Sequence, residues 1–177
     1  MPSLNEQQLK NILKKNNLEL KDFNVFFETG SHIGETINNM LDHFEKLITI
    51  EVSEKYYNIV KNKFKDIQKV KCVYGDSALI MEDVIPTERE GVIFWLDGHY
   101  SSDDTGKGIN DCPLIEELNV INSKFKNSVI IIDDYRMFGT KGNEDWTNIT
   151  QDNVIKCFDN KKIKDVFSID DRLIIFI

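Results

Sequence analysis

Acidic residues and glycines directly follow runs of apolar residues at three places in this sequence. Residues 28–34 read Glu-Thr-Gly-Ser-His-Ile-Gly, residues 95–99 read Trp-Leu-Asp-Gly-His, and residues 131–135 read Ile-Ile-Asp-Asp-Tyr. The apolar runs that precede them are typical of buried strands. In open α/β sheets, ligands bind at the carboxyl ends of the strands. The three segments therefore predict a ligand site with a group of carboxylates that could hold a metal ion.

An acidic residue also lies at or just beyond the end of each of the first three expected strands: Glu28, Glu51 and Asp76. A carboxylate after the second strand can accept hydrogen bonds from both hydroxyls of a ribose. The dinucleotide fingerprint Gly-x-Gly-x-x-Gly is absent, because His32 stands where its middle glycine would be. The three acids suit S-adenosylmethionine, which carries an amino group, a ribose and an adenine but no phosphate. Each acid alone could equally be a helix N-cap or a solvated loop residue.

Apolar periodicity predicts the elements that position these residues. We expect helices at residues 5–15, 35–44, 53–64, 77–84, 113–125 and 151–158, and strands at residues 24–28, 46–52, 70–74, 91–96, 128–132, 164–169 and 172–177. The alternation predicts an α/β fold: a single doubly wound, mostly parallel seven-stranded sheet with helices on both faces. The Asp170-Asp171 pair predicts a tight turn in a C-terminal antiparallel hairpin. Residues 1–177 are expected to form one domain, in which residues 1–20 are an N-terminal helix and lead-in.

Composition narrows the partners and the setting. The net charge of -8 argues against a nucleic-acid partner, which needs clustered basic residues. No apolar stretch approaches the ~20 residues of a membrane helix, and the N-terminus lacks the apolar core of a signal peptide. The 3 cysteines form no Cys-x-x-Cys pair, which fits reducing surroundings. We therefore expect a soluble, cytoplasmic protein with no membrane partner.

With these motifs, residues 24–177 resemble the class I methyltransferases that use S-adenosylmethionine. The resemblance implies a Rossmann-like methyltransferase fold, with Glu28, Gly30 and Gly34 on the methionine side of the cofactor. It also implies that Glu51 holds the ribose and that Asp76 and Ser77 contact the adenine. The cofactor contacts expected in full are Glu28, Gly30, Ser31, His32, Gly34, Glu51, Val52, Asp76, Ser77 and Asp97.

The ends of the fourth and fifth strands are similar to those of the metal-dependent sugar O-methyltransferases of the macrocin and mycinamicin type. That family carries Asp-Gly-Asp and Ile-Asp-Asp-Tyr there, which implies Mg²⁺ or Mn²⁺ ligands at Asp97, Asp133 and Asp134. Two successive residues can both be ligands only where the strand has already ended. His99 replaces the second Asp, the general base proposed in that family, and histidine can take this task. Catalytic roles are therefore expected for His99 and Asp97, although His99 could instead mark a different acceptor or merely form hydrogen bonds.

The expected function is an S-adenosylmethionine- and Mg²⁺-dependent O-methyltransferase that acts on a hydroxyl of a sugar, glycan or nucleotide sugar. Two alternatives stay open: a catechol-type small-molecule O-methyltransferase, and a cofactor-binding module without turnover. The polar loops at residues 101–111 and 140–148 are expected to contact the acceptor. Tyr135 and Trp146 are expected to stack on it, whereas Trp95 is expected in the core. A homo-oligomer is also possible.

Overall fold

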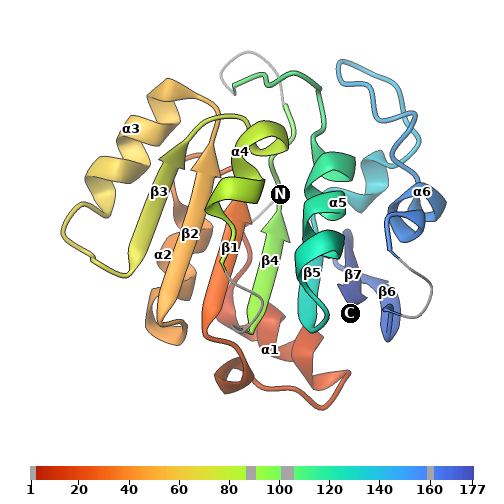
Figure 1. Ribbon diagram of the computed structural model, residues 1–177, viewed down its shortest axis with the longest axis horizontal. Coiled ribbons are helices and arrows are strands. Elements are labelled where there is room, and N and C mark those ends of the chain that lie inside the picture. The colour runs from red at the N-terminus through yellow and green to blue at the C-terminus, as the bar shows by residue number, and fades with distance from the viewer. Residues whose placement is uncertain (1–2, 87–90, 101–105, 159–161) are drawn as a thin grey trace.

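The protein folds around one seven-stranded sheet with the strand order β3-β2-β1-β4-β5-β7-β6 (Figure 1). The computed structural model describes residues 3–86, 91–100, 106–158 and 162–177. Five strands are mutually parallel and the last two form an antiparallel hairpin against β5, which confirms the predicted fold class. The strands are β1 (Val25–Thr29), β2 (Lys46–Glu51), β3 (Val70–Tyr74), β4 (Val92–Leu96), β5 (Ser128–Ile132), β6 (Asp165–Ile169) and β7 (Arg172–Phe176).

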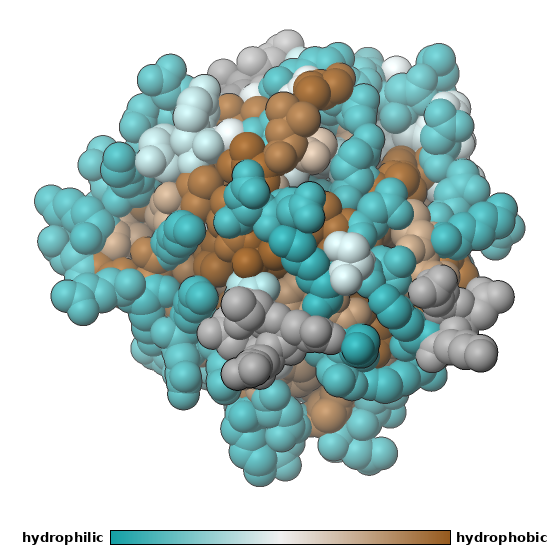
Figure 2. Space-filling view, viewed as in Figure 1, coloured by the Kyte–Doolittle hydropathy of each residue, from teal (hydrophilic) through white to brown (hydrophobic). Residues whose placement is uncertain are grey.

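In the described part of the chain, three α-helices cover each face of the sheet. The helices α1 (Glu6–Lys14), α2 (Glu35–Met40) and α3 (Glu54–Lys63) pack on one face. The helices α4 (Ser77–Val84), α5 (Leu114–Lys124) and α6 (Gln151–Lys156) pack on the other, which faces the viewer in Figure 1. Figure 2 shows apolar residues gathered over α4 on this side, where Leu79 is 62% exposed.

The central strands are buried on both sides because both layers of helices press on them. On β4, Val92, Phe94 and Leu96 join the core under α4 and α5, whereas Ile93 and Trp95 join the core under α1 and α2. This continuous burial explains the unbroken apolar runs that the sequence shows there. It also confirms the expectation that Trp95 lies in the core, since its side chain is 0% exposed.

The helix expected at residues 35–44 is shorter than predicted. It ends at Met40, and a 3₁₀ turn, η2 (Leu41–His43), follows it. The ammonium group of Lys69 donates hydrogen bonds to the carbonyl oxygens of Leu41 and Phe44. Because Lys69 satisfies these carbonyl oxygens, the helix can end before residue 44 without leaving them unpaired.

The hairpin turn anchors the segment after β5. Asp170 and Asp171 both have positive φ angles, 50° and 58°, as a type I′ turn requires. The Tyr135 N–H donates to the Asp171 carbonyl at 2.9 Å, and the Arg136 N–H donates to the Asp171 carboxylate at 2.6 Å. The 3₁₀ turn η3 (Tyr135–Met137) is thereby fixed against the hairpin, and with it the position of Asp134.

Among the described residues, no helix is long and apolar enough to cross a membrane. The cysteines Cys72, Cys112 and Cys157 are all free thiols.

Candidate active site

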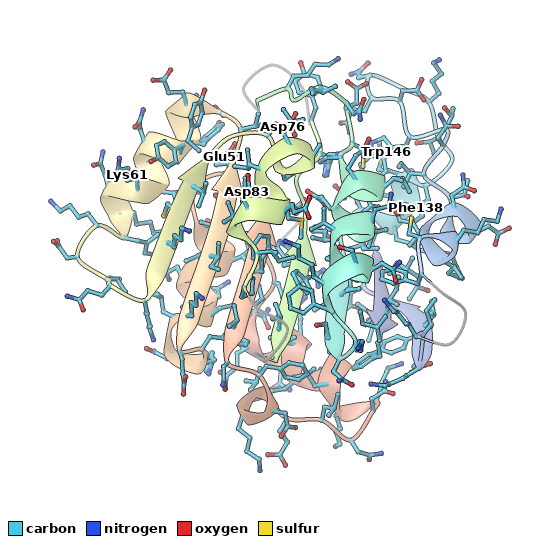
Figure 3. All side chains as sticks on the ribbon, viewed as in Figure 1. Glu51, Lys61, Asp76, Asp83, Phe138 and Trp146 are labelled. Atoms are coloured by element: carbon cyan, nitrogen blue, oxygen red, sulfur yellow. The ribbon has the colours of Figure 1, made fainter. Side chains whose placement is uncertain are left out.

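A cleft of about 530 Å³ opens at the carboxyl ends of the parallel strands, a size typical of small-molecule sites. Figure 3 shows Glu51 and Asp76 at this edge of the sheet. The cleft brings together most of the residues that the sequence singled out. Those that line it are Gly30, Ser31, His32, Glu51, Val52, Asp76, Ser77, Asp97, His99, Asp133 and Asp134.

Two expected cofactor contacts do not line the cleft. Glu28 is 1% exposed and accepts a hydrogen bond from the Thr49 hydroxyl at 2.5 Å, and Thr49 in turn bonds to Ser31 at 2.5 Å. Gly34 is the N-cap of α2, with a φ of 71° that favours glycine, and it packs against the Phe64 ring. With Glu28 buried and Gly34 at the start of α2, the cofactor contact expected of each stays a prediction.

Burial raises the pKa of Glu28 to about 8, from 4.5 for a free carboxyl group. Between these values the folded state keeps a proton that the unfolded state releases. The stability that protonated Glu28 allows is therefore fully present below about pH 4.5. It is lost progressively as the pH rises from 4.5 to about 8, by up to about 1.4 kcal/mol per pH unit.

We therefore expect Glu28→Gln to flatten the decline in stability on going from pH 5.5 to pH 7.5. Urea unfolding at both pH values measures the free energy of unfolding, with the exposed Glu45→Gln as the matched control. A wild-type decline that Glu28→Gln leaves unchanged would show that another group causes it.

The ends of β1 and β4 approach each other closely at Gly30. A Cβ atom on Gly30, whose φ is 82°, would lie 2.2 Å from the carbonyl oxygen of Asp97. Only glycine allows this contact, so Gly30, directly after β1, lets the Asp97 backbone lie this close. The sequence signal at Gly30 thus has a steric cause in the packing of β1 against β4.

Glu51 is held at the end of β2 by two backbone groups. The N–H of His32 donates to Oε2 at 2.8 Å, and the N–H of Ser53 donates to Oε1 at 2.9 Å. The His32 ring packs on Tyr56 with a centroid distance of 4.3 Å. Burial raises the pKa of Glu51, although these N–H donors oppose the shift. The carboxylate lies on the cleft wall with lone pairs left to accept further hydrogen bonds.

Asp76 combines two tasks. Its Oδ1 accepts the Ala78 N–H at 3.0 Å, so Asp76 is the N-cap of α4. Its Oδ2 accepts the Ile109 N–H at 2.7 Å, which ties the loop of residues 106–110 to this end of the cleft. The N-cap alternative is therefore correct for Asp76, which also lines the cleft.

Glu117, a buried acid that contacts Ser77, was not predicted from the sequence. Glu117 lies on α5, is 1% exposed, and accepts a hydrogen bond from the Ser77 hydroxyl at 2.5 Å. Burial raises its pKa to about 7. Helical spacing was the available signal, since Glu117 lies on the same helix face as Leu114, Leu118 and Ile121, which are all buried.

Asp97, His99 and Asp134 form a cluster at the ends of β4 and β5, which we call the acceptor cluster. His99 Nε2 lies 3.0 Å from Asp134 Oδ2, and His99 Nδ1 lies 3.6 Å from Asp97 Oδ1. One ligand atom from each residue can be chosen so that all three lie within 4.8 Å of one another. The side chains of His99 and Asp134 are 9% and 10% exposed.

Burial and pairing shift the pKa values of all three residues in the acceptor cluster. Burial raises the pKa of Asp97 to about 7. Burial opposes the charged form of His99, but the carboxylates of Asp134 and Asp97 outweigh it and raise its pKa. Burial also opposes ionisation of Asp134, yet its partners His99 and Arg136 lower its pKa. His99 and Asp134 thus favour an ion pair, beside an Asp97 that can hold or release a proton near neutral pH.

Asp133 does not join the acceptor cluster. Its Oδ1 lies 3.2 Å from Nε of Arg172, which is 1% exposed and lies over the Trp95 ring at 5.0 Å. Asp133 still continues the parallel ladder, since its N–H donates to the Leu96 carbonyl at 3.1 Å. Asp134 has a φ of 55°, so the chain turns there and the two carboxylates diverge. The group that could hold a metal ion thus consists of Asp97, His99 and Asp134, whereas Asp133 of the expected set lies apart from it, and metal binding itself stays a prediction.

The two aromatic residues expected to stack on an acceptor have other partners. Trp146 is 2% exposed, donates its Nε1–H to Glu144 at 2.9 Å and packs edge-on to His99 at 5.0 Å. The Tyr135 hydroxyl donates to Gln151 at 2.5 Å. Trp146 therefore orients His99 and is too buried to stack on an acceptor. Of the loop expected at residues 101–111, residues 101–105 lie outside the described part of the chain.

The fold can be matched to solved structures, although no protein-family model and no curated protein matches the sequence. A candidate caffeoyl-CoA O-methyltransferase from Staphylococcus aureus is 14% identical with a TM-score of 0.62, over 98% of this chain and 84% of that one. A candidate rRNA methylase from Clostridium thermocellum is 14% identical with a TM-score of 0.64, over 99% and 97% of the two chains. A Podospora anserina methyltransferase bound to S-adenosylhomocysteine is 13% identical with a TM-score of 0.58, over 88% and 72%. At these identities the similarity establishes the Rossmann-like methyltransferase fold.

Proposed function

We propose that this protein is an S-adenosylmethionine-dependent O-methyltransferase that acts on a hydroxyl of a sugar, glycan or nucleotide sugar. The observation that carries the proposal is the continuity of one cleft from Glu51 and Asp76 to the acceptor cluster. The first two acids suit a nucleoside, and the cluster suits a reacting hydroxyl. The methyltransferase fold supports the same conclusion.

Different residues of the cleft would bind the ribose, the adenine and the methionine moiety of the cofactor. Glu51, fixed by two backbone N–H groups, can accept hydrogen bonds from the ribose hydroxyls. Asp76 and Ser77, whose hydroxyl donates to Glu117, would contact the adenine. Gly30, Ser31 and His32 line the other end, where a methionine moiety would lie. When bound, S-adenosylmethionine supplies an electrophilic methyl group on its sulfonium sulfur.

The acceptor cluster would remove the proton of the attacking hydroxyl. Its two carboxylates and one imidazole fit a divalent cation, with Asp97, His99 and Asp134 as ligands. Such a cation, Mg²⁺ or Mn²⁺, would hold the acceptor oxygen and lower its pKa. Without a cation, the neutral form of His99 could accept the proton, and both carboxylates would stabilise the imidazolium that forms. Either arrangement would align the oxygen with the methyl group, and such alignment can by itself lower the activation barrier substantially.

The lining of the acceptor end favours a polyol over an aromatic ring. Asp97, His99, Asp133 and Asp134 lie at this end of the cleft. A catechol-type acceptor would call for a more apolar wall. Among the described residues that line the cleft there is no lysine or arginine, which favours an acceptor without phosphate, such as a sugar or glycan, over a nucleotide sugar or RNA. A cytoplasmic setting and a homo-oligomer stay predictions.

We expect calorimetry to detect one S-adenosylhomocysteine per chain, and Glu51→Ala to weaken this binding by about 10-fold or more, because hydrogen bonds to a charged group are lost. The exposed Glu54→Ala, on the first turn of α3, is the matched control. Transfer of a radiolabelled methyl group to a panel of sugars, nucleotide sugars and catechols then tests the acceptor class. Binding without transfer to any hydroxyl would favour a module that holds the cofactor without turnover.

A further inference from the structure

The acceptor cluster differs from an all-carboxylate site because an imidazole takes the third position. Arg172 holds Asp133, the third carboxylate near the cluster, through an ion pair buried on both sides. Among the described residues, the possible ligands of one ion are then an oxygen of Asp97, an oxygen of Asp134 and a nitrogen of His99. The mixed donor set follows from the divergence of Asp133 and Asp134 at the end of β5.

The geometry of the cluster fits a small dication. First-row metal ions bind nitrogen and oxygen ligands at about 2.0–2.2 Å, so two neighbouring ligands of an octahedral ion lie about 3 Å apart. His99 Nε2 and Asp134 Oδ2 lie 3.0 Å apart. The guanidinium group of Arg136 pairs with Oδ1 of Asp134 at 2.6 Å, so Oδ2 faces the imidazole. Three protein ligands leave positions that a vicinal diol can fill.

The orientation of the imidazole is set by its surroundings. Trp146 packs edge-on to the ring, and the Nδ1 side faces Asp97 at 3.6 Å. Each ring nitrogen of His99 thus lies near a carboxylate of the cluster before any ion is bound, so little ordering of the imidazole is needed to bind one.

We infer that His99 is a metal ligand and that the acceptor cluster binds a first-row transition-metal dication, of the Mn²⁺ to Co²⁺ type, more tightly than Mg²⁺. Magnesium prefers an all-oxygen shell and loses its waters reluctantly, whereas imidazole suits transition metals. The inference rests on the proposed function only in placing the ion beside a methyl donor. It assigns His99 a role as ligand in place of the role as base expected from the sequence.

Metal binding to the full chain tests this inference without any turnover. The electron paramagnetic resonance signal of free Mn²⁺ disappears on binding, and Mg²⁺ competition gives both affinities. We expect one Mn²⁺ per chain, bound about 10-fold or more tightly than Mg²⁺. His99→Ala should weaken Mn²⁺ by about 10-fold or more while changing Mg²⁺ little, and His99→Asp should bring the two affinities together. His43→Ala, remote from the cleft, is the matched control.

Three results would overturn the inference: equal affinity of the wild type for Mn²⁺ and Mg²⁺, no Mn²⁺ binding, or unchanged Mn²⁺ affinity in His99→Ala. Co²⁺ absorption of the wild type gives a reading that needs no variant, since a visible band shifted from that of aqueous Co²⁺ is expected. Calorimetry with S-adenosylhomocysteine on the same preparation separates the two proposals. Cofactor binding without metal selectivity overturns only this inference, and metal selectivity without cofactor binding overturns only the proposed function.

Discussion

Asp97→Asn is expected to lower methyl transfer by about 10²-fold or more while the protein stays folded and still binds S-adenosylhomocysteine. Asparagine keeps the shape of the side chain but removes the charge that pairs with His99 and that could bind a cation. The loss should therefore fall on the rate of the chemical step. Single-turnover kinetics with radiolabelled cofactor, together with calorimetry, measure the two effects separately.

Asp83→Asn is the matched control for this prediction. Asp83 lies on the exposed side of α4, away from the cleft lining (Figure 3), so its variant should transfer methyl groups as the wild type does. Full activity in Asp97→Asn would place the reacting centre elsewhere in the molecule.

Arg172→Met is expected to reduce the free energy of unfolding by about 3–5 kcal/mol near pH 8. Asp133, 5% exposed, would then be a buried carboxylate without its guanidinium partner. The loss should shrink at lower pH, because burial already raises the pKa of Asp133 and the protonated form needs no counter-charge. Urea unfolding at pH 6 and pH 8 measures both effects.

Arg136→Met serves as the comparison for the buried pair. Arg136 is 53% exposed and pairs with Asp171 and with Asp134, which keeps His99 as a second partner, so its loss should cost about 1 kcal/mol or less. The double variant Asp133→Leu/Arg172→Met should recover much of the stability that Arg172→Met loses. An Arg172→Met variant as stable as Arg136→Met would contradict the structural role given to the Asp133–Arg172 pair.

The sheet could be predicted from the sequence because local and tertiary signals agree. The bounds of β3 and β5 match the expected ranges, since Gly75 and the Asp133-Asp134 pair stop the apolar runs. The bounds of α4 match too, because Asp76 is its N-cap and Pro86 follows its end. The helix at residues 35–44 was predicted too long because Lys69, distant in sequence, caps its end.

The cleft could be predicted in part. Glu51, Asp76 and Asp97 reach it because they follow parallel strands that end at one edge of the sheet. The direction of a side chain after a strand depends on the backbone dihedrals there, which spacing does not give. Asp133 was therefore assigned to the metal set although Arg172, from β7, draws it away. Trp146 was expected to contact an acceptor because its burial depends on elements distant in sequence, which local sequence does not reveal.

The most direct measurement is a crystal structure of the protein soaked with S-adenosylhomocysteine. We expect the ribose hydroxyls within hydrogen-bonding distance of Glu51, the adenine beside Asp76 and Ser77, and the sulfur atom facing Asp97 and His99. An unoccupied cleft at saturating ligand, or a ligand whose sulfur points away from these two side chains, would contradict the proposed reaction.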